Sequence, residues 1–272
     1  MDSVKFCKFH GFGNDYIVVE SDELKSIGDL GAFSEKICHR NTGVGGDGIA
    51  VLEKTNDSNA DYSCRIINPD GSEAAFSGNG TRCAVAYLYY KNFFSNENLS
   101  LATKSGVKNY QLLSREENTF WFRAELGKPK SIENYELQIT NYESAFSVVN
   151  VDVGNPVCVL FIENFDFDWR EIGKQIETHE HFPNRTNVVF VKIIDRENIE
   201  VRIWERGAGE TSSSGTCSIA AAVASAFTGK TERGVSVHAP GGTTEAMWRE
   251  TDDEMLITGR ADLSFCGEYF FS

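Results

Sequence analysis

Two stretches of the sequence each combine a serine, nearby glycines and the start of an apolar helix. The first, GSEAAFSGNGTRCAVAYLYY, carries Ser77, and the second, AGETSSSGTCSIAAAVASAF, carries Ser214. A helix N-terminus offers unpaired N–H groups and a partial positive charge, and glycines let the backbone close around an anion. Each stretch is therefore suited to binding a carboxylate beside its serine.

Two such loops acting together would flank the carbon next to the bound carboxylate. That arrangement suits the transfer of a proton from one face of an α-carbon to the other. Cysteine is the best side chain for this task, because a helix N-terminus lowers a thiol pKa from about 8.5 toward neutrality. A serine hydroxyl donates and accepts hydrogen bonds but is not readily ionised at neutral pH. The sequence thus predicts two loops that bind a carboxylate well but carry serines, which are poor groups for proton transfer.

The two stretches also form an internal repeat. Glu73 stands four positions before Ser77, Glu210 stands four positions before Ser214, and the serines lie about half a chain apart. Both helices are apolar all round, which predicts that they are buried. We therefore expect an α/β fold of two similar halves, residues 1–130 and 131–272, with a cleft between them that both helix N-termini face. The alternative is a chance likeness between two glycine-led, alanine-rich helices.

The remaining pattern is mostly β, with two further helices. VKFCKFHGFGNDYIVVE predicts two strands joined by a glycine turn. LGAFSEKICHR places Leu30, Phe33 and Ile37 on one helical face, and DWREIGKQIETH predicts a helix with Asp168 as its N-cap.

The composition of the chain limits the classes of partner that it can bind. The formal net charge of −14 disfavours nucleic acid and anionic membranes, and no apolar run approaches a membrane span. Seven cysteines, an odd number with no CxxC pair, predict a reducing compartment, the cytoplasm, and no disulfide framework. The five histidines are scattered and no nucleotide-binding fingerprint is present, so we expect neither a metal nor a cofactor.

The chain resembles the diaminopimelate epimerase family along nearly its whole length. The resemblance is carried by motifs in the family's order: FHGFGNDYIVVE, RIINPDGSEAAFSGNGTRC, VGNPVCV, RTNVVFV, WERGAGETSSSGT and APGG. It implies two pseudo-symmetric domains, each a β-barrel-like sheet around a central helix. It also implies cofactor-independent interconversion of LL- and meso-diaminopimelate, in lysine and cell-wall biosynthesis. The expected partner is a small amino acid, and the expected assembly is a homodimer.

The resemblance also implies roles for individual residues. Glu205 and Arg206 fall where the family uses an acid and a base to hold and orient the substrate, so the candidate catalytic residues are Ser77, Ser214 and Glu205. The candidate substrate-binding residues hold polar groups or offer loop amides to the reacting carboxylate: Asn14, Asn68, Gly78, Asn79, Asn155, Asn187, Arg206, Gly215 and Thr216. Asn14 and Asn68 are alternatively plain turn residues, and Arg206 a solvated strand-end charge.

The departures from the family lie at the reacting groups. The two acid–base cysteines of the family fall on Ser77 and Ser214, its histidine after GNP falls on Val157, and a glycine falls on Cys217. By position, neither Cys83 nor Cys217 replaces the missing thiols. The serines were either introduced to trap a substrate or arose naturally, and Val157 and Cys217 favour natural divergence.

Three functions remain open. The chain is a diaminopimelate-type epimerase altered by its serines, an isomerase or dehydratase of another carboxylate, or a ligand-binding member without turnover. The retained asparagines, with Glu205 and Arg206, supply polar groups for a distal end of the ligand. That favours a ligand resembling diaminopimelate over a short amino acid.

Overall fold

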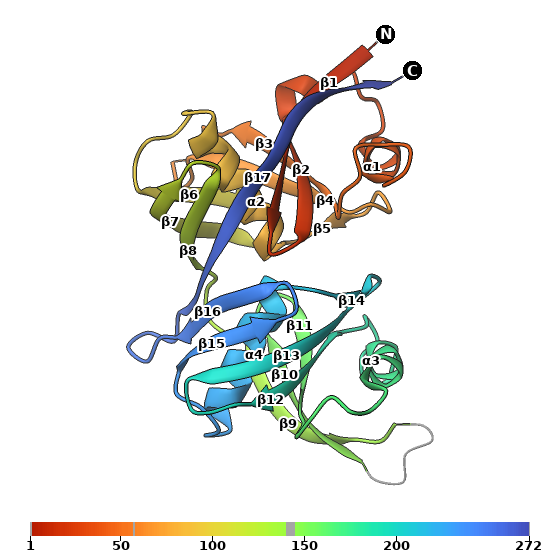
Figure 1. Cartoon of the computed structure of the whole chain (residues 1–272), viewed down its shortest axis with the longest axis vertical. Coiled ribbons are helices and arrows are strands. Elements are labelled where there is room, and N and C mark those ends of the chain that lie inside the picture. The colour runs from red at the N-terminus through yellow and green to blue at the C-terminus, as the bar shows by residue number, and fades with distance from the viewer. Residues whose placement is uncertain (1, 57, 140–144, 272) are drawn as a thin grey trace. The chain divides into compact units, whose positions relative to one another are not determined.

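The computed structural model describes residues 2–56, 58–139 and 145–271. The chain forms two compact units, one of residues 1–124 with 259–272 and the other of residues 125–258 (Figure 1). The sequence predicted a single boundary near residue 130. It did not predict that residues 259–272 return to the first unit.

The first unit is a closed barrel around a buried helix. Eight strands follow one another around it: β1, β2, β3, β4, β6, β7, β8 and β17, which pairs with both β8 and β1. The elements of this unit are β1 (Asp2–Gly11), β2 (Asn14–Glu20), η1 (Ser21–Leu24), α1 (Leu30–Cys38), β3 (Ile49–Lys54), β4 (Tyr62–Ile67), β5 (Glu73–Ala74), α2 (Gly78–Tyr90), β6 (Asn98–Thr103), β7 (Gly106–Glu116), β8 (Thr119–Glu125) and the end of β17 (Met255–Phe271).

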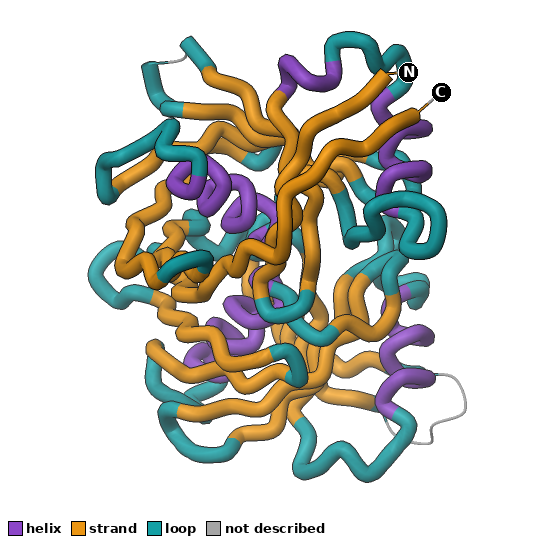
Figure 2. The backbone as a smooth tube through the Cα atoms, turned by 45° about the horizontal axis from the view of Figure 1, so that its top comes forward, coloured by secondary structure: helices purple, strands orange, loops and turns teal. Residues whose placement is uncertain are grey.

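The second unit surrounds α4 with strands in the same way, as the tube in Figure 2 makes visible. Its strands pair in the order β9, β10, β11, β12, β13, β15, β16 and the start of β17, with β14 added to β13. Its elements are β9 (Ser131–Leu137), β10 (Phe146–Asp152), β11 (Pro156–Phe161), α3 (Trp169–Glu177), β12 (Asn187–Ile193), β13 (Asn198–Glu205), β14 (Gly209–Thr211), α4 (Gly215–Phe227), β15 (Gly234–Ala239) and β16 (Gly242–Trp248).

The pairing pattern of the first unit recurs in the second. β1 and β2 pair antiparallel, as β10 and β11 do, and the parallel pair of β2 with β3 recurs as β11 with β12. The parallel pair of β4 with β6, which brackets α2, recurs as β13 with β15, which brackets α4. The internal repeat and the α/β fold predicted from sequence are therefore confirmed.

The central helices are buried as their composition predicts. Every residue of α2 from Gly78 to Tyr89 is buried, as is every residue of α4 from Gly215 to Ser225. The outer helices instead bury one face. Phe33 and Ile37 of α1 join the core of the first unit, and α3 begins at the predicted N-cap, where Asp168 accepts a hydrogen bond from the N–H of Glu171.

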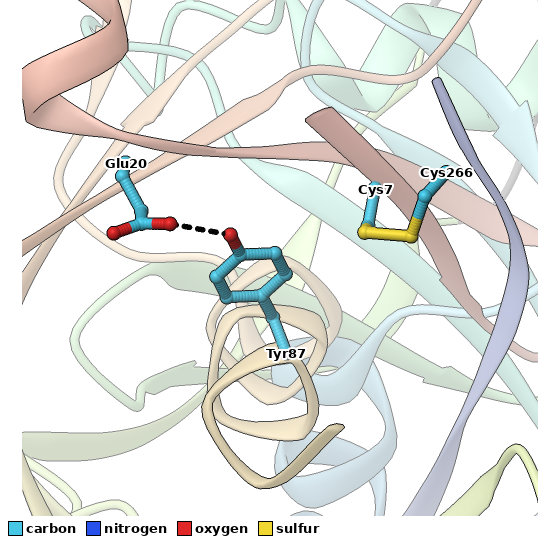
Figure 3. Close-up of a disulfide and its surroundings, with 4 residues drawn as sticks. All are labelled: Cys7, Glu20, Tyr87 and Cys266. Carbon is cyan, nitrogen blue, oxygen red and sulfur yellow. Dashed lines mark hydrogen bonds between the residues drawn. A yellow bond between two sulfur atoms is a disulfide. The ribbon is translucent and has the colours of Figure 1, made fainter. Parts of the chain in front are cut away.

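One predicted feature of the cysteines is wrong, because Cys7 and Cys266 form a disulfide (Figure 3). They lie directly opposite each other on the antiparallel strands β1 and β17, with their Cα atoms 4.0 Å apart. The bridge joins residues separated by 259 positions, and only the strand register brings them together. The other five cysteines are free and buried: Cys38, Cys64, Cys83, Cys158 and Cys217.

We expect loss of this disulfide to lower the free energy of unfolding by about 2–4 kcal/mol, because the cross-link restricts the unfolded chain. Cys266 is exposed, so a reductant reaches the bond. Denaturant unfolding with and without reductant measures the change, and the Cys7→Ala, Cys266→Ala double variant, insensitive to reductant, is the control. Thiol titration of the unreduced, denatured protein should find five reactive cysteines, and seven would contradict the bridge.

Candidate active site

Ser77 is the N-cap of α2. Its backbone is extended, with φ −137° and ψ 120°, and its Oγ accepts a hydrogen bond of 3.1 Å from the N–H of Gly80. The N–H of Thr81 bonds the Ser77 carbonyl. The N–H groups of Gly78 and Asn79, in the same first turn, have no partner within the helix and carry its positive end. Both are residues that the sequence assigned to carboxylate binding.

A tyrosine reaches the same serine from β2. Tyr16 Oη lies 2.8 Å from Ser77 Oγ. The tyrosine ring packs against two glycines, since a Cβ added at Gly80 would lie 2.8 Å from Tyr16 Cε1 and one added at Gly48 would lie 3.0 Å from it. The absence of side chains at both positions makes room for the ring that carries this hydroxyl.

Asn14 and Asn79, both predicted to bind substrate, belong to one hydrogen-bond chain. The buried Arg82 guanidinium donates to Asn79 Oδ1, Asn79 Nδ2 donates to Asn14 Oδ1 over 3.1 Å, and Asn14 Nδ2 donates to Asp47 Oδ2 over 2.7 Å. Because each amide meets a donor at its oxygen and an acceptor at its nitrogen, the orientation of both side chains is fixed. Asn14 is therefore more than a turn residue.

A charge cluster supports this chain from the side away from α2. Asp15, which is largely buried, pairs with Lys8 at 2.7 Å and with Arg40 at 2.9 Å. Burial alone would raise the pKa of the Asp15 carboxyl, but hydrogen bonds from Arg40 and Lys8 outweigh it and lower this pKa from 3.8 to about 2. Arg40 also pairs with Asp47 at 2.7 Å, so the cluster holds the residue that orients Asn14.

Asp15→Asn is expected to cost about 2 kcal/mol of folding free energy at pH 7. Since the folded-state pKa of Asp15 is depressed, its stabilisation is complete above the unfolded value near 3.8 and is lost as the pH falls toward about 2. Denaturant unfolding of both proteins between pH 7 and pH 2.5 measures the difference. A gap that stays constant over this range would contradict the assignment.

Asn68 lies apart from these residues in its own turn. It follows β4, its Nδ2 donates to Ser72 Oγ over 2.9 Å, and its backbone N–H bonds the Ser72 carbonyl. Its predicted substrate contact stays a prediction.

In the second unit, Ser214 is the N-cap of α4 but makes a different bond. Its side chain does not cap the helix; its hydroxyl donates to Glu205 Oε2 over 3.0 Å. Thr211 Oγ1 donates to the other oxygen of the same carboxylate over 2.8 Å. Ser214 and Thr216 are each 5% exposed and Glu205 is partly buried, so a hydroxyl and a carboxylate meet at the N-terminus of α4 with limited access to solvent.

Arg206, next to Glu205, is tied to two of the predicted asparagines. Its N–H donates to Asn187 Oδ1 over 2.8 Å, and its Nη2 lies 3.5 Å from Asn155 Oδ1. Asn187 is 3% exposed, and its Nδ2 has no hydrogen-bond partner within the described part of the chain. A buried amide donor without a partner is costly, so this nitrogen is suited to a ligand oxygen.

Glu177 holds the turn that carries Glu205 and Arg206. Its buried carboxylate accepts from Trp204 Nε1 over 2.8 Å and from the N–H of Gly207 over 2.9 Å, the residues on either side of the pair. Glu177 ends α3, where the helix dipole disfavours an anion. These donors offset that cost, so the end of α3 anchors the turn.

The chain also departs from the family at Val157 and Cys217, and neither these residues nor Cys83 has a reactive setting. Val157 is fully buried in β11. Cys217 and Cys83 are also fully buried, and burial raises the pKa of both thiols well above their ordinary value. The repeated glutamates are surface partners of arginines, Glu73 of Arg65 and Glu210 of Arg170.

The described residues, 2–56, 58–139 and 145–271, contain neither a cluster of metal ligands nor a membrane-spanning helix. Among them no three His, Cys, Asp or Glu side chains are grouped so as to hold a metal ion. No helix within these ranges has both the length and the apolar character needed to cross a membrane.

The sequence profile described as "Diaminopimelate epimerase" matches residues 6–132 and 149–264. The chain belongs to the diaminopimelate epimerase family. It is 37% identical to a diaminopimelate epimerase of Pelotomaculum thermopropionicum over 278 residues, 97% of this chain and 98% of that one. It is also 37% identical to that of Clostridium perfringens over 279 residues, 98% and 100% of the two chains. Family membership supports an amino-acid epimerase, a kind of isomerase.

Solved structures share the diaminopimelate epimerase fold at much lower identity. A hydroxyproline epimerase from Agrobacterium vitis superposes with a TM-score of 0.75 at 13% identity, covering 98% of this chain and 92% of that one. A phenazine biosynthesis protein of the PhzF family from Bacillus anthracis gives 0.74 at 15% identity, with full coverage of both chains. At these identities the likeness shows the fold alone.

Sequence reasoning missed Tyr16, Asp47, Arg82 and Glu177. Tyr16 and Arg82 lie within the motifs that carry the family resemblance, whereas Asp47 and Glu177 lie outside them, and only the folded chain reveals which polar atoms all four contact. Tyr16 directly follows the Asn14–Asp15 pair, which was the one signal available.

Proposed function

We propose that this chain binds a diaminopimelate-type amino acid and epimerises it slowly, with hydroxyl groups in place of thiols. The observation that carries this proposal is the bond from Ser214 to Glu205 at the N-terminus of α4. A serine hydroxyl moves a proton when an adjacent base accepts its own, and the Glu205 carboxylate is such a base.

The binding groups support the same substrate class. Each unit offers first-turn N–H groups suited to a carboxylate, from Gly78 and Asn79 in α2 and from Gly215 and Thr216 in α4. Arg206 and the unpaired Nδ2 of Asn187 would hold polar groups at the far end of the ligand. Such a ligand carries charged groups at both ends, as diaminopimelate does.

Proton transfer would use both serines, one to remove the α-proton and the other to supply a new one. Ser214 Oγ takes the α-proton while its own proton passes to Glu205, and the C–H electrons remain on the carbon. Ser77 then gives a proton to the carbanion. The reverse reaction runs the same steps backwards from the oppositely protonated form, in which Ser77 takes a proton and Ser214 gives one. We also propose that the protein works as a homodimer in the cytoplasm, in lysine and cell-wall biosynthesis.

The test is α-proton exchange in D₂O, followed by ¹H NMR with LL- and meso-diaminopimelate. Loss of the α-proton signal with conversion between the two stereoisomers is expected, slowly. Calorimetric binding without exchange would favour the ligand-binding alternative. Absence of both binding and exchange would remove diaminopimelate as the substrate and point to another carboxylate.

A further inference from the structure

The hydrogen bonds around Ser77 favour donation of its own hydrogen over acceptance of another proton. A serine hydroxyl has one hydrogen and accepts two hydrogen bonds. Within the described residues, two groups meet Ser77 Oγ: the Gly80 N–H at 3.1 Å, which donates, and Tyr16 Oη at 2.8 Å. If Tyr16 also donates, both acceptor positions are filled and the hydrogen of Ser77 is left for the ligand.

Tyr16 is the better donor of the two hydroxyls. A phenol is more acidic than an aliphatic alcohol, so the bond is stronger with the phenol hydrogen between the oxygens. The ring has little freedom to turn away, because it is 6% exposed and packs closely on Gly48 and Gly80. Gly80 thus contributes both a donor to Ser77 and the space for the second donor.

Ser214 has the opposite arrangement. Its hydrogen is directed to the Glu205 carboxylate at 3.0 Å, and the Thr216 hydroxyl lies 3.4 Å from its oxygen. With its hydrogen committed to Glu205, the Ser214 oxygen is the atom left to accept an incoming proton. The two serines, identical in type and position at the N-caps of α2 and α4, are therefore chemically different. Ser214 is hydrogen-bonded to a base, the Glu205 carboxylate, and Ser77 is hydrogen-bonded to an acid, the Tyr16 phenol.

We propose that Tyr16 is a positioning residue that makes Ser77 the proton donor of the native chain, an inference that rests on the proposed function. As the carbanion takes the hydrogen of Ser77, the Ser77 oxygen takes the hydroxyl hydrogen of Tyr16. Tyr16 is left as a phenolate and Glu205 as a carboxylic acid, and solvent restores both. No redox partner or cofactor enters this balance.

Tyr16→Phe removes the hydroxyl and keeps the ring. Exchange of diaminopimelate in D₂O should become at least about tenfold slower, which is the scale of one lost hydrogen bond at a charge-bearing step, with little change in KM. Tyr87→Phe is the matched control, since the Tyr87 hydroxyl bonds Glu20 over 2.7 Å on the same helix that Ser77 caps (Figure 3). It should leave the rate unchanged.

Measuring Tyr16→Phe in a second protein, the double cysteine variant, distinguishes a role in positioning the Ser77 hydrogen from a purely structural role. In the Ser77→Cys, Ser214→Cys protein, a thiol supplies its own proton, so adding Tyr16→Phe should change the rate less than about twofold. An equal loss in both backgrounds would overturn the proposal and show that Tyr16 merely maintains the structure.

The remaining outcomes are also decisive. Exchange by the cysteine protein without any by the native chain would overturn the role of Tyr16 and keep diaminopimelate as the substrate. Native exchange that Tyr16→Phe leaves unchanged would do the same. Exchange by neither protein would instead reject the proposed function itself, together with the inference built on it.

Discussion

Replacing Ser77 and Ser214 together by cysteine is expected to raise the rate of diaminopimelate α-proton exchange at least about 100-fold over the native chain. General acid–base groups contribute about 10²–10⁴-fold, and a helix N-terminus favours the thiolate. The N-cap backbone needs no change, since both serines are already extended at the first turns of α2 and α4. Initial rates by NMR in D₂O measure the effect.

The single variants serve as controls for the pair. Each restores one thiol, so each should fall between the native chain and the double variant. Ser218→Cys, one turn into α4 and 2% exposed, changes the same atom away from the N-cap and should have no effect. A double variant that binds diaminopimelate but exchanges no faster than the native chain would show that the serines do not stand at the proton-transfer positions.

The second large effect concerns Glu205. Glu205→Gln should slow exchange by the native chain at least about 100-fold, because an amide still accepts the Ser214 hydrogen bond but cannot take its proton. Exchange rates and calorimetric binding, measured together, separate the loss of a base from the loss of a ligand contact. Binding should weaken much less than exchange.

Glu210→Gln is the matched control, because Glu210 is a half-exposed partner of Arg170 and has no contact with Ser214 among its hydrogen bonds in the described chain. It should leave the rate unchanged. In the double cysteine background, Glu205→Gln should cost far less, since the thiolate is then the base. An equal cost in both backgrounds would mean that Glu205 holds the substrate and takes no proton.

Local chemistry made several features predictable from sequence. Asp168 caps α3 because its side chain reaches an N–H three residues away, and the apolar surfaces of α2 and α4 require burial whatever surrounds them. The repeat was visible because both units use the same glycine-led helix start. These features depend on residues close together in the chain.

Features set by strand register were not predictable. Cys7 meets Cys266 only because β17 lies beside β1, and no spacing in the sequence marks that pair. The same holds for Tyr16 and Ser77, which the barrel brings together from β2 and α2, and for Glu177 and Trp204. The predicted asparagines find some of their hydrogen-bond partners far away in the sequence, as Asn14 of β2 finds Asp47 in the loop before β3.

The return of residues 259–272 has a consequence for synthesis. The second unit is one continuous segment, so all its contacts are available once residue 258 has left the ribosome. The first unit, although it starts the chain, cannot close until β17 arrives, and until then β1 and β8 present unpaired backbone edges. During translation the order of completion is therefore reversed relative to the order of the sequence, and the nascent first unit is the species most in need of protection from aggregation.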